Sequence, residues 1–100
     1  MTASEWLQAQ GLCLSDIDFI ETVIANQAAH QQGFLNEKQL AELMHQHFPE
    51  KTYHASSQLS ITDFNKLLQD NSIIIDGREI IRRYMIQGFC MALCNRMLTE

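Results

Sequence analysis

The sequence predicts an all-α fold, with a single domain of about five helices spanning residues 1–100. Apolar residues recur at spacings of three and four along most of the chain, which is the period of an amphipathic helix. Capping residues, glycines and the one proline mark where these patterns begin and end. Hydrophobic residues make up 46 % of the chain and charged residues 19 %, which is typical of a compact folded domain.

The first two helices are each bounded by a glycine. A short helix carries Trp6 and Leu7 and is expected to end before Gly11. A longer helix with isoleucines on one face is expected to end before Gly33. Glycine is the usual residue just past a helix end, because it adopts the left-handed conformation without steric cost.

The middle of the chain is predicted to hold a longer helix at 37–48, closed by Pro49, and a short helix at 61–70. Between them, 49–59 is the longest irregular stretch. A second connector at 72–75 contains three consecutive isoleucines, and β-branched residues favour extended backbone. We therefore expect a short, buried extended segment there, with a brief pairing to 58–60.

Each predicted helix start shows a small polar residue followed three positions later by Asp, Glu or Gln. This spacing is typical of a capping box, in which each side chain binds the other residue's backbone N–H. The five instances are Thr2/Glu5, Ser15/Asp18, Asn36/Gln39, Ser60/Asp63 and Asp76/Glu79.

The C-terminal helix is expected to be the longest, at 77–97, about 30 Å at 1.5 Å per residue, with the other helices packed around it. Its sequence carries two apolar stripes, of which one can line the core. The other must be covered by a helix of the same chain, by a second copy or by another protein. We expect partner binding at the residues of this second stripe: Ile86, Phe89, Cys90, Leu93 and Met97.

Net charge is −5, and the acidic residues are concentrated in the first half of the chain. Residues 1–50 contain seven acidic residues and one basic residue, whereas 51–100 contain five acidic and six basic residues. An acidic surface suits a basic protein partner and disfavours nucleic acid. The alternative is a solvated surface that keeps the domain soluble.

A cluster of Arg78, Arg82 and Arg83 offers a second hypothesis, that of a DNA-binding transcriptional regulator in which these residues contact a polyanion. The competing interpretation pairs Glu79 with Arg82 or Arg83 on an ordinary solvated helix face.

Cysteines and histidines suggest a third hypothesis, a metal or redox sensor. Cys90 and Cys94 lie one helical turn apart and could add thiolates to imidazole ligands. On a helix, however, His45 and His47 point in nearly opposite directions. The sequence has four histidines: His30, His45, His47 and His54. We expect no resident metal.

Neither a catalytic nor a cofactor motif of any specificity is present, so we expect no enzyme activity and no cofactor. The longest apolar run is too short for a membrane span, and the N-terminus lacks the features of a secretory signal. Three cysteines exclude a complete internal disulfide framework. The sequence therefore predicts a small cytoplasmic interaction module, an adaptor, regulator or inhibitor, that forms a homodimer through its C-terminal helix.

Overall fold

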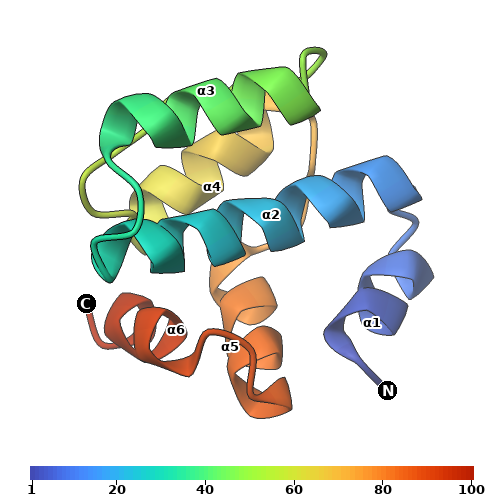
Figure 1. Cartoon of the computed structure of the whole chain (residues 1–100). Helices are drawn as coiled ribbons and strands as arrows, with labels where there is room; N and C mark the ends of the chain where they lie inside the picture. The colour runs from blue at the N-terminus through green and yellow to red at the C-terminus, as the bar shows by residue number, and fades with distance from the viewer.

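The computed structural model describes all 100 residues and confirms the all-α prediction, since 65 % of the residues lie in six helices and none in a strand (Figure 1). Twenty-four buried hydrophobic residues form one core. No helix has both the length and the hydrophobicity that crossing a membrane requires. The helices are α1 (Ala3–Ala9), α2 (Leu14–Gln31), α3 (Glu37–His47), α4 (Ile61–Asp70), α5 (Gly77–Gln87) and α6 (Met91–Leu98).

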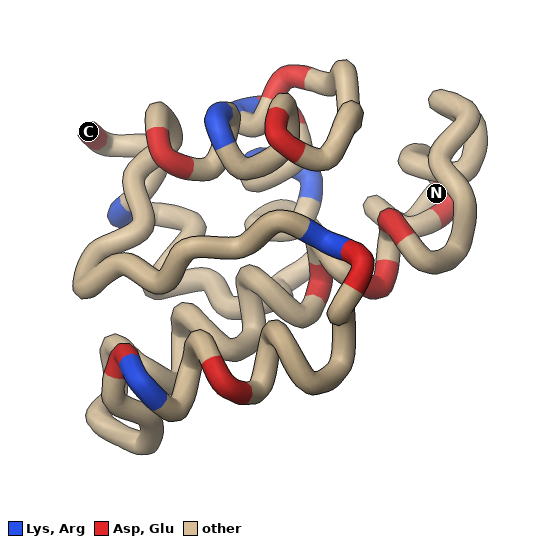
Figure 2. The backbone as a smooth tube through the Cα atoms, turned by 90° about the horizontal axis from the view of Figure 1, so that it is seen from above, with Lys and Arg blue, Asp and Glu red and all other residues tan.

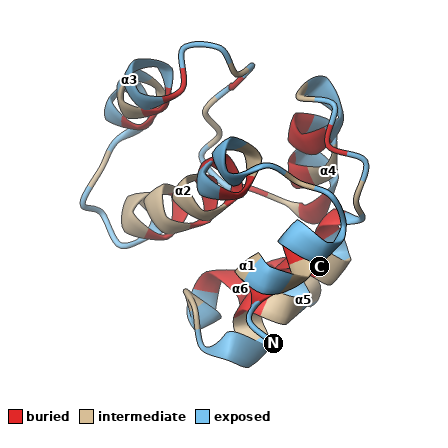
Figure 3. Ribbon diagram, turned by 90° about the vertical axis from the view of Figure 1, so that its right-hand side faces the viewer, coloured by how far each residue is buried: buried red, intermediate tan, exposed pale blue.

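The centre of the molecule is α2, not the C-terminal helix. α2 packs against α1, α3 and α6, and it crosses the molecule between the α3–α4 side and the α5–α6 side (Figure 1). α5 completes the core by packing against α1, α4 and α6. Buried positions on each helix face this shared interior, whereas exposed positions face outward (Figure 3). The predicted arrangement around a long C-terminal helix is therefore wrong.

The expected 77–97 helix is broken into α5 and α6 at residues 88–90. Gly88 has φ 89°, and its N–H bonds the carbonyl of Met85 at 3.0 Å. The N–H of Phe89 bonds the carbonyl of Tyr84, also at 3.0 Å. This pair of bonds is a Schellman motif, the same helix ending found at Gly11 and Gly33. Gly88 is thus a helix stop, and Cys90 (φ 48°) redirects the chain into α6.

The 72–75 connector forms no strand and is only partly buried, although its isoleucines predicted a buried extended segment. Ser72 (φ 60°) closes α4, and the N–H of Ile73 bonds the carbonyl of Leu68 at 2.9 Å. Ile73 is buried but Ile74 is 94 % exposed. No pairing with 58–60 forms, because the backbone groups of Ser72 and Ile73 are used to end α4 instead.

Three of the five predicted capping boxes form, at Thr2/Glu5, Asn36/Gln39 and Ser60/Asp63. The Ser15/Asp18 prediction is wrong, since the N-cap of α2 is Cys13, two residues before Ser15, and it has no side-chain cap. Asp76 caps α5 through the N–H of Arg78, but Glu79 does not reciprocate because it binds arginines.

Candidate interaction surfaces

The break between α5 and α6 leaves an apolar corner on the surface. The side chain of Ile86 is 77 % exposed and that of Met91 57 %. Phe89 and Cys90 lie between them and are half-buried. We call these four residues the α5–α6 corner. Three of them, Ile86, Phe89 and Cys90, belong to the predicted partner-binding stripe, and Met91 was missed.

Leu93 and Met97, the other two residues of that stripe, lie in the core. Their exposed fractions are 1 % and 0 %. The turn at residues 88–90 lets α6 pack beside α5 and against α2, so the face that a continuous helix would leave open is covered within the chain. The continuous second stripe therefore does not exist as a surface.

Contacts with three helices hold the α5–α6 corner in place. The Phe89 ring packs against Tyr84, with 5.4 Å between the ring centroids. Tyr84 is fully buried and donates its hydroxyl to Glu21 of α2 at 2.9 Å. Burial and this bond raise the pKa of Tyr84 well above its ordinary value. The Gln87 Oε1 atom accepts from the N–H of Ala3 at 2.8 Å, which ties the end of α5 to the start of α1.

Glu79 forms ion pairs with two of the three clustered arginines. It pairs with Arg82 and, at 2.9 Å, with Arg83, and their hydrogen bonds lower the pKa of its carboxyl. The Arg83 guanidinium also stacks on the ring of Trp6 in α1, 4.2 Å from the ring centroid. Arg78 donates to the carbonyl of Leu98 at 3.1 Å. Each guanidinium thus has a partner within the chain.

The histidines are dispersed, and no three His, Cys, Asp or Glu side chains come together where they could hold an ion. The His30 ring bonds the carbonyl of Leu35 at 2.6 Å, and the His45 ring that of Tyr53 at 3.2 Å. Both contacts fasten loops to helices.

All three cysteines are unpaired thiols in different environments. Cys13 is exposed, Cys90 half-buried and Cys94 fully buried. Burial raises the pKa of Cys90, and burial together with the charge of Cys90 raises the pKa of Cys94 to about 11. The thiolate is the reactive form, so these environments favour inert thiols at α6.

We predict that iodoacetamide will alkylate Cys13 first. With an ordinary thiol pKa of 9.0, the shift at Cys94 lowers its thiolate fraction about 100-fold at neutral pH. The order in which the three cysteines react is measured by mass spectrometry of peptides from protein that has been alkylated for increasing times. Denatured protein is the control, in which all three thiols should react alike. Early alkylation of Cys94 in folded protein would contradict the described packing.

Acidic side chains line an open groove of about 530 Å³ between the start of α2 and the end of α3. Asp18, Glu21 and Glu50 contribute carboxylates, and no lysine or arginine lines the groove. Lys51 lies nearby but pairs with Asp16. In Figure 2 the acidic positions gather around the N-terminal part of the tube. The excess of acidic residues in the first half of the sequence therefore forms an acidic region on the surface of the molecule.

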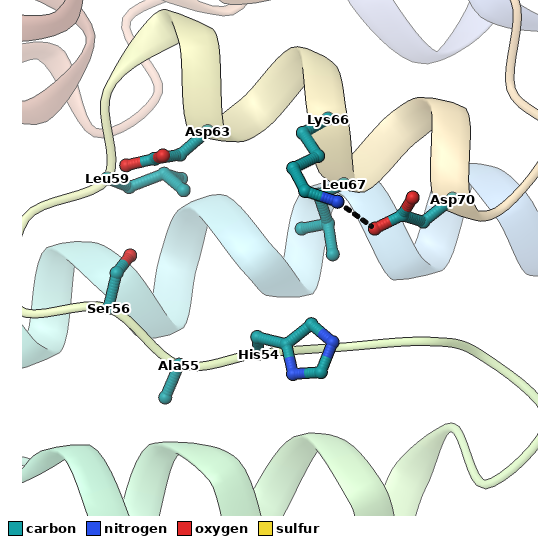
Figure 4. A pocket seen from close by; sticks show the side chains of 8 residues that line it. All are labelled: His54, Ala55, Ser56, Leu59, Asp63, Lys66, Leu67 and Asp70. Carbon is teal, nitrogen blue, oxygen red and sulfur yellow. Dashed lines mark hydrogen bonds and ion pairs between the residues drawn. The ribbon is translucent and has the colours of Figure 1, made fainter.

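A second hollow, of about 310 Å³, lies between α4 and the connector that leads into it (Figure 4). Its apolar part comes from Ala55, Leu59 and Leu67, and its α4 wall carries Asp63, Lys66 and Asp70. We call this hollow the α4 cavity. The sequence predicted only an irregular connector here, since the cavity depends on how the connector folds back.

Together these features define a class, a small all-α domain with an exposed apolar corner, an acidic groove and a cavity beside an irregular connector. No protein-family model, no curated protein and no solved structure matches the chain.

Proposed function

We propose that this chain is a small protein–protein interaction module, an adaptor, regulator or inhibitor, that self-associates through the α5–α6 corner. The observation that carries the proposal is the exposure of Ile86 and Met91 on either side of a turn that is tied to α1 and α2. Exposed apolar side chains close together in the chain are typical of contact surfaces.

The distribution of charge favours a second copy of this chain as the partner that binds the α5–α6 corner. The molecule carries a net charge of −5, so two copies repel each other over most of their surfaces. No charged residue occurs between Tyr84 and Asn95, a stretch that contains the whole α5–α6 corner. A twofold pair places the same patch on both sides, and this patch itself carries no charged side chain.

The proposed dimer is weak, because the corner is small. Burying one large apolar side chain contributes about 1.5–3 kcal/mol. Two copies of Ile86 and Met91 therefore only offset the loss of translational and rotational freedom, about 4–15 kcal/mol. We expect association at high protein concentration and monomer at low concentration.

Sedimentation velocity over a range of concentrations tests self-association. The wild-type weight-average mass should rise with concentration, whereas the double variant Ile86→Glu/Met91→Glu should remain monomeric, because each partner would bury unpaired carboxylates. The matched control is Ile74→Glu, a change at an isoleucine in the α4–α5 connector that is even more exposed, at 94 %. A wild-type mass that stays at the monomer value, or equal loss of association in the control, would overturn the proposal.

No observation from the structure supports the two alternative functions, DNA binding and metal or redox sensing. DNA binding would need arginines that already contact Glu79, Trp6 and Leu98. A metal or redox sensor would need ligands that the fold keeps apart or buries. Both remain predictions from the sequence. The three unpaired cysteines support a cytoplasmic location, where thiols stay reduced.

A further inference from the structure

The connector between α3 and α4 has no regular secondary structure, bends at Ser57 and Gln58, and leaves most of its main-chain groups unpaired. None of the N–H groups from Tyr53 to Leu59 donates to an acceptor within the protein. The carbonyls of His54, Ala55, Ser57 and Gln58 likewise accept no bond. A segment with free main-chain donors and acceptors can pair with the main chain of another polypeptide, here at His54, Ala55, Ser57 and Gln58.

Three helices hold this connector in position. The carbonyl of Tyr53 binds His45 of α3 at 3.2 Å, and that of Ser56 binds Gln27 of α2 at 3.1 Å. The carbonyl of Leu59 binds Arg96 of α6 at 2.7 Å. Buried side chains at Tyr53 and Leu59 fix the two ends. A partner would therefore meet a preorganised segment and would not bear the entropic cost of ordering it.

The α4 cavity lies directly beside this segment (Figure 4). Its volume of about 310 Å³ can take an apolar side chain against Leu59 and Leu67. The charges on its α4 wall favour a basic neighbour. Lys66 pairs with Asp70 at 3.4 Å, whereas Asp63 has no cationic partner and contacts only the N–H of Ser60.

We infer that residues 54–58 and the α4 cavity bind an extended, basic segment of a partner protein. The peptide backbone pairs with the connector, one apolar side chain enters the cavity, and an adjacent lysine or arginine faces Asp63. This surface is separate from the α5–α6 corner, so the inference stands independently of self-association.

Titration of the isotope-labelled full chain, followed by two-dimensional NMR, tests the inference. The probe is a pool of capped heptapeptides in which valine, leucine or isoleucine alternates with lysine. We expect saturable shifts at the amides of residues 54–58 and around Asp63. A pool with alternate backbone nitrogens methylated keeps the side chains but cannot complete the backbone pairing, and should lose these shifts. A pool with glutamate in place of lysine should bind more weakly.

Asp63→Asn tests the charge on the protein side. Asparagine keeps an oxygen for the Ser60 N–H, so the start of α4 is preserved. Binding of the lysine pool should weaken about 2- to 5-fold, as expected for one exposed ion pair. The matched control is Asp18→Asn in the groove between α2 and α3, which should leave binding unchanged. The inference is overturned if residues 54–58 show no saturable shift, if the methylated pool binds equally well, or if the shifts lie at the α5–α6 corner.

Discussion

Replacing Leu93 with alanine is expected to lower the free energy of unfolding by about 3 kcal/mol. Leu93 is 1 % exposed and packs within the core from α6, so truncation leaves a cavity and removes buried apolar area. Urea denaturation followed by far-UV circular dichroism measures the change. The result matters because a continuous C-terminal helix would leave Leu93 on the open stripe.

The matched control is Ile86→Ala, on the same predicted stripe but 77 % exposed. Its effect on the free energy of unfolding should stay within about 0.5 kcal/mol, as is usual for a surface substitution. Similar, small effects at both positions would contradict the packing of α6 and would restore the interpretation of a continuous, exposed second stripe.

Gly77→Ala is expected to destabilise the fold by about 2 kcal/mol, in the range of overpacking substitutions. This direction is unusual, because alanine normally stabilises a helix relative to glycine by about 0.5–1 kcal/mol. Here a Cβ atom would lie 2.6 Å from Oδ1 of Asn65 and 2.9 Å from the ring of Phe64. Phe64 is buried, so its ring has little room to move. Thermal and urea unfolding both measure the loss.

A double-variant cycle separates this clash from a general effect on α5. Asn65→Ala removes one of the two close neighbours of Gly77, together with the 2.8 Å bond from the Gly77 N–H. The double variant should therefore be more stable than the sum of the single losses predicts, by about 1 kcal/mol. Strictly additive losses, or stabilisation by Gly77→Ala alone, would show that α4 and α5 do not approach closely here.

Local signals in the sequence predicted most of the helix ends correctly. Thr2, Asn36 and Ser60 cap helices as expected, because the capping side chain and its partner lie only three residues apart. Gly11 and Gly33 end helices for an equally local reason, their positive φ. Gly88 is the residue at which the C-terminal helix breaks, and glycine is a usual helix stop. The apolar residues on either side of Gly88 nevertheless fit one continuous helical pattern, so the sequence predicted a single helix.

The interaction surfaces were less predictable. Ile86 could be proposed from the sequence because it lies on the second apolar stripe of the predicted C-terminal helix, whereas the exposure of Met91 depends on the direction of α6. The α4 cavity brings together residues of the connector and of α4 that no periodic pattern relates. The partners of Arg78, Arg83 and Tyr84 likewise come from other helices.

The sequence by itself determined that this chain is helical, where most of its helices begin, and that it carries more apolar residues near its C-terminus than one helix face can bury. Only the tertiary structure decided which of those residues stay exposed. The reason is that one left-handed turn, at Gly88–Cys90, sets the direction of α6 and brings Leu93 and Met97 against α2 while Ile86 and Met91 remain outside. Helix signals act over three or four residues, whereas burial depends on contacts between segments far apart in the chain.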